Sequence, residues 1–252
     1  MIKLSERLQT IADRTEGSEA MADIGTDHGF LPIYMLQDGR CSKAVVSDIS
    51  GPSLQKAVEN GRMYLGDTEY FEARQGSGLE TVARGEVDTV VIAGMGGKLI
   101  RDIVSDDIEH TVSFRRFVFQ PRNGQGHLRK WLCDNGFRII NEDVVVEGDN
   151  LPEIITVISP GHDTDAVSMS TRHMKHMKHF TGDDIQYRIP PWIIDAGGPV
   201  SDFLHMNLDR EKRILKNVMM SKSRRIDQEE HICSNIYYIK SLIKEIENGK
   251  EK

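Results

Sequence analysis

Residues 21–32 read MADIGTDHGFLP, and this stretch decides the fold class. A short apolar segment runs into Gly25, then into polar residues, and then into Gly29. That order is typical of a β-strand that ends in a tight turn before a helix, where α/β proteins bind their ligands. A dinucleotide-binding loop would keep a glycine where this chain has Asp27. Because a carboxylate there would repel a pyrophosphate, the turn argues against NAD and FAD.

The rest of the chain up to residue 160 continues the same pattern. Apolar segments rich in β-branched residues span 20–25, 43–49, 70–76, 87–94, 115–121, 137–147 and 153–159. Segments with helical spacing at 53–65, 96–104 and 124–136 lie between them, whereas the last two strands follow each other without a full helix. This order predicts an α/β fold of Rossmann-like type, with a doubly wound and mostly parallel seven-stranded sheet.

The pattern changes after residue 160. Apolar residues then recur at helical spacing, as at Leu204 and Leu208, and the isoleucines from Ile232 to Ile246 are separated by steps of 4, 3, 4 and 3. Such a heptad seam predicts two long helices packed as an antiparallel coiled-coil hairpin, with a seam between two chains as the alternative. We therefore expect two domains, residues 1–160 and residues 161–252, in a monomer or a weak homodimer.

Composition limits the class of protein. No run in the 252 residues approaches the ~18 apolar residues of a membrane span, and the N-terminus lacks the features of a secretory signal. The three cysteines are far apart and odd in number, which favours the reducing cytoplasm. Residues 1–160 contain 17 Lys and Arg against 25 Asp and Glu, whereas residues 161–252 contain 15 against 14. The second part is therefore the better candidate for contact with nucleic acid.

S-adenosylmethionine fits the quoted turn better than a dinucleotide does, because it has positive charge and no phosphate. Asp23 ends the first strand and is expected to face the amino-acid portion of this cofactor. Asp48 ends the second strand, where a carboxylate can accept hydrogen bonds from both ribose hydroxyls. Gly25 and Gly29 allow the backbone to approach the ligand closely. Asp23, Gly25 and Asp48 in register on successive strands favour a methyltransferase over a plain tight turn.

The ends of the third and fourth strands agree with this cofactor. After the third strand, Ser77 is expected to meet the edge of the adenine. After the fourth strand, Gly94, Gly96 and Gly97 are expected to leave space for a flat methyl acceptor, with Met95 as an apolar wall. The same segment, GMGGKL at 94–99, lacks the Ser or Thr and the upstream glycine of a Walker A loop.

Seven stretches, in order across residues 4–158, resemble the bacterial tRNA (adenine-22-N1)-methyltransferase family. They read LSERL, ADIGTDHGFLPIYML, SDISGPSLQKAVEN, RQGSGLE, DTVVIAGMGGKLIRDI, QPRNGQGHLRKWL and LPEIITV. The resemblance implies a class I methyltransferase that uses S-adenosylmethionine to methylate N1 of an adenine in the D-arm region of tRNA. It implies cofactor contacts at Arg7, Asp23, Gly25, Thr26, Asp27, His28, Asp48, Gly76, Ser77, Ala93, Gly94, Met95 and Gly96.

Three of these positions, Arg7, Asp48 and Ser77, have an open role or differ from the usual family residue. Arg7 would approach either the cofactor or a substrate phosphate. Ser77 stands where the family usually has an aspartate, and Asp48 stands where a glutamate is expected. Both departures keep a hydrogen-bonding side chain.

Adenine N1 has a lone pair that can attack the sulfonium methyl directly, so the enzyme must mainly align the two and exclude water. A carboxylate near the ring would stabilise the cationic product. The candidate catalytic residues are Asp27 for its charge, and His28 and Gln120 as hydrogen-bonding groups. The alternatives are that Asp27 only holds the turn and that Gln120 only ends the fifth strand.

Because N1 lies on the Watson–Crick edge, the target adenine must be unpaired or extruded. Basic residues near the fifth strand, and those between Arg210 and Arg225 in the tail, are expected to hold the surrounding phosphates, with a solvated face as the alternative. The tip of the hairpin is expected to hold the tRNA backbone. The predicted RNA-binding residues are Arg115, Arg116, Arg122, Arg129, Lys130, Arg213, Lys222, Arg224 and Arg225.

Three histidines, His173, His176 and His179, are spaced three apart and fan out around a helix, so we expect no metal. Two other functions stay open. One is a methyltransferase for another RNA or a small molecule, and the other is a non-catalytic protein that binds tRNA and cofactor.

Overall fold

The computed structural model describes residues 2–163, 166–221 and 225–250. The strands are β1 Ala20–Ile24, β2 Lys43–Asp48, β3 Phe71–Gln75, β4 Thr89–Met95, β5 Arg116–Pro121, β6 Arg138–Val144 and β7 Glu153–Ile158. The α-helices are α1 Glu6–Arg14, α2 Phe30–Gln37, α3 Gly51–Leu65, α4 Gly97–Ser105, α5 Ile108–Thr111, α6 Gln125–Asp134, α7 Met174–Met177, α8 Ile185–Arg188, α9 Val200–Met220 and α10 Ile226–Lys250. Two 3-10 turns are η1 Gly78–Thr81 and η2 Pro191–Asp195. All the predicted strands are confirmed.

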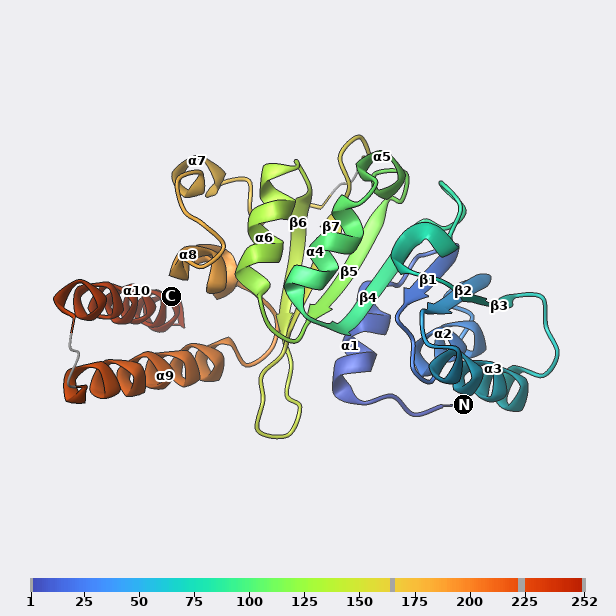
Figure 1. Cartoon of the computed structure of the whole chain (residues 1–252), viewed down its shortest axis with the longest axis horizontal. Helices are drawn as coiled ribbons and strands as arrows, with labels where there is room; N and C mark the ends of the chain where they lie inside the picture. The colour runs from blue at the N-terminus through green and yellow to red at the C-terminus, as the bar shows by residue number, and fades with distance from the viewer. Residues whose placement is uncertain (1, 164–165, 222–224, 251–252) are drawn as a thin grey trace.

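The strands form one sheet in the order β3-β2-β1-β4-β5-β7-β6 (Figure 1). β1 to β5 all run parallel to one another, whereas β7 is antiparallel to both of its neighbours, β5 and β6. The predicted doubly wound, mostly parallel sheet with a terminal hairpin is therefore confirmed. The order of strands reverses between β1 and β4, and ligands bind at such a switch point, beyond the carboxyl ends of the strands.

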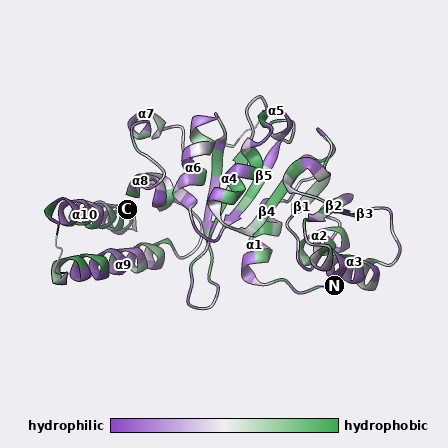
Figure 2. Ribbon diagram, in the orientation of Figure 1, coloured by the Kyte–Doolittle hydropathy of each residue, from purple (hydrophilic) through white to green (hydrophobic). Residues whose placement is uncertain are grey.

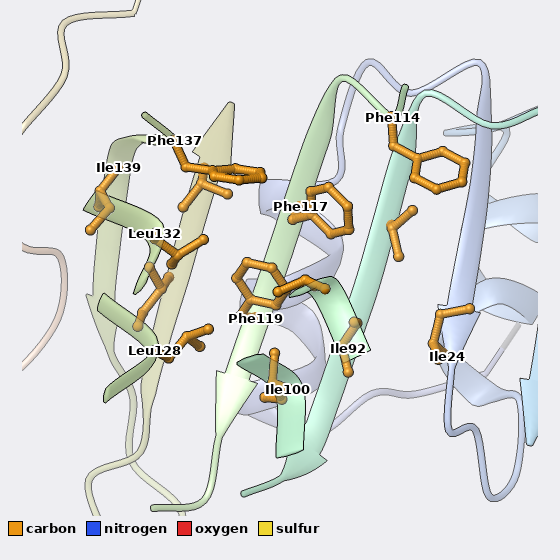
Figure 3. Packing of buried hydrophobic residues seen from close by; sticks show 14 of the residues in the cluster. Ile24, Ile92, Ile100, Phe114, Phe117, Phe119, Leu128, Leu132, Phe137 and Ile139 are labelled. Carbon is orange, nitrogen blue, oxygen red and sulfur yellow. The ribbon is translucent and has the colours of Figure 1, made fainter. Parts of the chain in front are cut away.

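Helices cover both faces of the sheet because its central strands are apolar on both faces. In Figure 2, β4 and β5 are mostly hydrophobic (green), while the helices have both kinds of residue. On one face, α4 and α6 pack Ile100, Leu128 and Leu132 against Phe117 and Phe119 (Figure 3). This dense packing fixes the strand ends at which the candidate functional residues lie.

On the other face, α1 and α2 pack Ile11 and Met35 against Met21 of β1 and its neighbours. The sequence pattern does not mark α2, because its residues FLPIYMLQ are apolar on nearly every side and show no periodic stripe. Leu31 and Ile33 are buried there as well. A short helix that is enclosed in this way is recognised from the fold rather than from amphipathic spacing.

The segment between residues 166 and 199 packs against the sheet. Tyr187 and Trp192 are buried in the same core as the residues of β4 and β5. Trp192 Nε1 donates a hydrogen bond of 2.8 Å to Glu142 of β6. The boundary at residue 160 stays a prediction, and the core of the first predicted domain includes side chains from beyond that boundary.

Helix α10 runs back along α9 (Figure 1). The predicted apolar stripes meet within one chain, where Leu204 and Leu208 of α9 share a core with Ile239 and Leu242 of α10. The helical hairpin is thus present, and its seam is filled by its own two helices. Coiled-coil geometry and the oligomeric state stay predictions.

Candidate active site

The carboxyl ends of β1 and β2 bring together the acidic and glycine positions that the sequence singled out. Asp23 is in register with Val46 of β2 and with Val91 of β4. The backbone N–H groups of Gly25 and Thr26 donate to the Ser47 carbonyl, at 2.7 and 3.0 Å. These bonds hold the turn after β1 against the end of β2, next to Asp48.

Gly25 has a backbone conformation that favours glycine, and the flexible end of the Met95 side chain lies against it. Its φ is +79°, and a Cβ atom at this position would lie 1.9 Å from Met95 Cε. Met95 therefore lies directly on the turn after β1. Thr26 Oγ1 accepts a hydrogen bond of 3.0 Å from the Gly29 amide, which closes the turn where α2 begins.

Asp23 is an ionisable side chain in a buried position, with 9% of its surface exposed. Burial raises the pKa of Asp23 to about 6. The hydrogen bond from Thr26 and the charge of Arg7 oppose this shift, and the charge of Asp48 adds to it. A carboxylate held in this way is stabilised by a cationic ligand, and a neutral or anionic ligand offers no such gain.

Asp48 lies half-buried at the end of β2. Its Oδ1 atom accepts a hydrogen bond of 2.6 Å from the Ser50 amide. Its Oδ2 atom makes no hydrogen bond within the described parts of the chain, so this atom is available to a hydroxyl group. The Gly76 amide donates to the Asp48 carbonyl at 3.2 Å, which places the turn after β3 beside it.

Ser77 lies exposed in that turn, and its amide donates a hydrogen bond of 2.6 Å to Glu80 Oε1. A Cβ atom at Gly76 would lie 2.5 Å from Thr81 Cγ2, so the close packing of η1 requires this glycine. The contact between Ser77 and an adenine stays a prediction.

The glycines after β4 have different neighbours. The Gly97 amide donates to the Asn123 carbonyl at 2.7 Å, and a Cβ atom at 97 would lie 2.5 Å from the Gly124 carbonyl oxygen. Gly97 therefore lets α4 begin against the turn after β5, and the expectation that it leaves space for an acceptor is wrong. The nearest atoms to a Cβ at Gly94 and Gly96 belong to side chains, those of Arg122 at 3.6 Å and Asn123 at 3.1 Å.

Gln120 joins three elements at the end of β5. It is buried, and its Oε1 atom accepts hydrogen bonds from the Gly94 amide at 3.2 Å and from Arg7 Nη1 at 3.3 Å. Arg7 Nε also donates to Glu147 Oε1, in the loop between β6 and β7, at 2.6 Å. In the strand pairing, Gln120 is in register with Ala93. Arg7, Asp23 and Gln120, which lie far apart in the sequence, thus meet at one edge of the sheet.

Asp27 and His28 lie on the exposed side of the turn after β1. Lys56 Nζ donates a hydrogen bond of 2.9 Å to Asp27 Oδ1, and His28 Nε2 lies 3.0 Å from Asp27 Oδ2. The bond from Lys56 holds the pKa of Asp27 below its ordinary value. The Asp27 carboxylate is therefore charged near neutral pH and is a poor proton acceptor. The catalytic roles of these two residues stay predictions, with charge stabilisation favoured for Asp27.

A cleft of about 950 Å³ opens beside these strand ends, between the sheet and α9. Arg7 and Gln120 belong to its lining. The turn after β5, the loop between β6 and β7, α8 and α9 supply most of the remaining walls. The basic side chains in the lining are Arg7, Lys98, Arg122, His127, Arg188 and Arg210. Three of these six, Lys98, His127 and Arg188, were not singled out from the sequence, because only the fold brings together residues so widely separated along the chain.

The predicted RNA-binding residues near β5 separate into distinct groups. Arg122 lines the cleft. Arg115 and Arg116 lie at the start of β5, at the opposite end of that strand from Gln120. Arg129 is fully buried and donates to Glu142 at 2.7 Å and to Glu153 at 2.5 Å. The prediction is wrong for Arg129, since a guanidinium enclosed by two carboxylates does not reach a phosphate.

The other predicted RNA-binding residues lie on α6, on α9, just before α10 or beyond the described ranges. Lys130 Nζ lies 2.5 Å from Asp134, and Arg225 Nη2 lies 2.6 Å from Asp227. Arg213 is exposed on α9. Lys222 and Arg224 lie outside the described residues.

The three histidines of residues 172–180 do not converge. His173 contacts the Trp192 ring at 6.0 Å between centroids, and His179 contacts the Phe180 ring at 4.0 Å. Over residues 2–163, 166–221 and 225–250, no group of three or more His, Cys, Asp and Glu side chains could hold a metal ion. Over the same ranges, no helix combines the length and the apolar character needed to cross a bilayer.

Comparisons with known proteins agree with this geometry. The family described as a methyltransferase domain matches residues 4–155. A Bacillus subtilis protein described as a tRNA (adenine(22)-N(1))-methyltransferase is 34% identical over 174 residues, which cover 67% of this chain and 71% of that protein. A Streptococcus agalactiae structure of the NADB-Rossmann superfamily is 27% identical, with a TM-score of 0.78, and the match covers 96% of this chain and 98% of that one. The B. subtilis tRNA methyltransferase TrmK has the same fold, at 24% identity and a TM-score of 0.77, over 96% of this chain and all of that one.

Proposed function

This chain belongs to the tRNA (adenine(22)-N(1))-methyltransferase family, and from that premise we propose that it transfers a methyl group from S-adenosylmethionine to N1 of adenine 22 in tRNA. The observation that carries the proposal is the 34% identity to the B. subtilis enzyme, in a match that covers 71% of that protein. The positions of Asp23, Gly25 and Asp48 at adjacent strand ends support the same reaction.

The residues at the strand ends fit S-adenosylmethionine. The buried Asp23 carboxylate, with its pKa raised to about 6, gains stabilisation from a cationic amino-acid group. Asp48 offers an oxygen to the ribose diol, and the positive φ of Gly25 brings the backbone close to the ligand. Ile49, which follows Asp48, is 72% exposed and offers an apolar surface beside that position.

When bound, the cofactor supplies a methyl group on a positively charged sulfur. Adenine N1 attacks with its own lone pair, so the protein needs no strong base to begin the reaction and contributes chiefly by alignment. Gln120 is held by the Gly94 amide and by Arg7, and it can present its amide to the acceptor base from a fixed position. Asp27 can stabilise the positive charge that methylation leaves on the ring, since Lys56 keeps its carboxylate ionised.

The cleft beside Gln120 gives the acceptor a place next to these strand ends. Its volume lies near the upper end of the ~300–1,000 Å³ typical of ligand pockets. N1 is hidden in a paired base, and enzymes that modify such atoms extrude the nucleotide into a pocket of this kind. We further propose that the protein acts in the cytoplasm, as a monomer or a weak homodimer.

Transfer of labelled methyl from S-adenosylmethionine to an unmodified tRNA transcript tests the proposal. Digestion of the product to nucleosides should place the label in 1-methyladenosine. The matched control is the same transcript with guanine in place of adenine 22, which should stay unlabelled. Equal labelling of both transcripts would contradict the target position. An absence of label, with the cofactor bound, would favour another substrate or a non-catalytic binding protein.

A further inference from the structure

The cleft contains positive charges that the protein itself leaves unpaired. Lys98 of α4, Arg122 after β5 and Arg210 of α9 all line it. Within the described residues, none of these three side chains makes an ion pair or a hydrogen bond. The other basic side chains in the lining already have carboxylate partners, in the pairs Arg7–Glu147, His127–Asp183 and Arg188–Glu211.

The acidic side chains of the cleft do not neutralise the three unpaired cations. Its lining contains three carboxylates, those of Glu147, Glu153 and Asp183. Glu147 and Asp183 lie 2.6 and 2.9 Å from Arg7 and His127 respectively. Glu153 lies 2.5 Å from the buried Arg129. Each lining carboxylate thus contacts a guanidinium or an imidazole, and none of the three pairs with Lys98, Arg122 or Arg210. The positive charge of these three side chains is therefore left to attract an anion.

We propose that Lys98, Arg122 and Arg210 bind the phosphates on the two sides of the target adenosine. Helix α9 of the C-terminal extension, the part of the chain after residue 160, then forms one wall of the acceptor site. This inference rests on the proposed function, and it assigns to the cleft the sugar-phosphate backbone of the substrate nucleotide. Lys98 and Arg122 come from the methyltransferase fold and Arg210 comes from the extension, so the two parts of the chain bind the same short stretch of RNA.

The position of the cleft favours a nucleotide over a free anion. Gln120, at the end of β5, lines the cleft and is hydrogen-bonded to the Gly94 amide, beside the place expected for the methyl group. Pro121, Leu151 and Met206 add apolar surface to the lining, against which a base can pack. A cleft that joins apolar surface to unpaired cations matches a base flanked by two phosphates.

Buried contacts fix α9 relative to the sheet. Arg188 Nη2 donates to Glu211 Oε1 at 3.0 Å, and Asn235 Nδ2 of α10 donates to Glu211 Oε2 at 3.2 Å. Glu211 is only 3% exposed, and it follows Arg210 directly. The Arg188 carbonyl in turn accepts a bond of 3.2 Å from Arg129 Nη1. This chain of bonds runs from α6 through Arg188 to α9 and α10, and it holds the part of α9 that contains Arg210 against the methyltransferase fold.

The test is steady-state methylation of unmodified tRNA by K98Q, R122Q and R210Q, with cofactor affinity measured separately by calorimetry. We expect the KM for tRNA to rise about tenfold in each variant, since a charge-assisted bond to a phosphate is lost. The affinity for S-adenosylmethionine should stay within twofold. The slope of the logarithm of tRNA affinity against the logarithm of salt concentration should fall by about 0.7–0.9 for each lost contact.

The matched control is K244Q, which removes an exposed charge from α10 of the same extension but outside the cleft. Its KM and salt slope should equal those of the unchanged protein. If R210Q behaves like K244Q while the unchanged protein methylates tRNA, the inference is overturned and the proposed function stands. If the unchanged protein transfers no methyl group to tRNA, the proposed function fails, and the inference fails with it. A fall in cofactor affinity equal to the rise in KM would also overturn the inference.

Discussion

At the scale of single residues, the site depends on Asp23, an aspartate whose buried position disfavours its charged form. Asp23 has a pKa raised to about 6 by burial, so the folded chain binds its proton more tightly than the unfolded chain does. The free energy of unfolding therefore falls as the pH rises from about 4 to about 6. Above pH 6 the full destabilisation from the buried charge of Asp23 is present. The difference between the ordinary pKa of 3.8 and the folded value of about 6 corresponds to a loss of at most about 3 kcal/mol in the free energy of unfolding.

Replacing Asp23 with asparagine should remove that cost. At pH 7.5 we expect D23N to be more stable to urea by about 1–3 kcal/mol, with a gain near zero at pH 4. The same change should weaken S-adenosylmethionine binding at least tenfold, because the cationic group loses its partner. Urea denaturation at the two pH values and calorimetry measure both effects. D67N, at an exposed aspartate, is the control, and an equal stability change for D23N at both pH values would contradict the electrostatic cause.

Asp27 differs from Asp23 in exposure and in charge state. Since Lys56 lowers its pKa, Asp27 is ionised throughout the neutral range and acts through charge alone. We expect D27N to lower the rate of methyl transfer about tenfold while cofactor affinity changes much less. Single-turnover rates and binding constants, measured between pH 6 and 8, test this. Equal losses in rate and affinity, or a pH dependence that D27N abolishes, would count against the assignment.

At the scale of secondary-structure elements, a buried ionic cluster joins α6 to β6, β7 and η2. Arg129 donates to Glu142 and Glu153, and Trp192 also donates to Glu142. Burial raises the pKa of Glu153, and the charge of Arg129 opposes that shift. Removing the guanidinium would leave two buried carboxylates without a cation, which is strongly destabilising because the uncompensated charges stay out of water.

We expect R129M to lower the free energy of unfolding by about 3–5 kcal/mol. The loss should be smaller at pH 5 than at pH 8, because protonation neutralises the two glutamates once their cation is gone. The double variant R129M/E142Q should recover part of the stability, since it removes one of the two charges and keeps an acceptor for Trp192. Denaturant unfolding of both variants at both pH values measures this. A loss under 1 kcal/mol for R129M would show that the cluster does not stabilise the fold.

At the scale of the whole molecule, the extension and the sheet are joined through a common core. Tyr187 and Trp192 pack among residues of β4 and β5, and a separate cluster joins Val144 of β6 to Phe203 and Ile239 of the hairpin. The extension therefore completes the hydrophobic core and also supplies Arg210 to the cleft.

A chain ending at residue 160 should be much less stable than one ending at residue 199. The shorter chain loses Trp192 and Tyr187 from the core. Removing a large buried aromatic side chain lowers the free energy of unfolding by about 3–5 kcal/mol. Thermal unfolding followed by circular dichroism should place the melting temperature of the shorter chain far below that of the longer one. Equal melting temperatures would instead support an independent domain that ends at residue 160.

The sequence by itself determined the sheet and the strand-end positions of this protein. Apolar segments separated by helical ones predict seven strands, and because ligands bind at the carboxyl ends of parallel strands, the same pattern places Asp23, Gly25 and Asp48 together. These inferences depend on local spacing and on short-range geometry, which a linear pattern records directly. The recognition of family motifs rests on the same local information.

Only the tertiary structure decided which charges are available for binding. Arg129 and Arg122 look alike in the sequence, yet one is enclosed by two glutamates and the other lines the cleft. Lys98 and Arg210 lie more than a hundred residues apart in the sequence and line the same cleft. The physical reason is that burial, pairing and convergence of charges depend on side chains brought together from distant elements, and no local pattern along the chain records those distances.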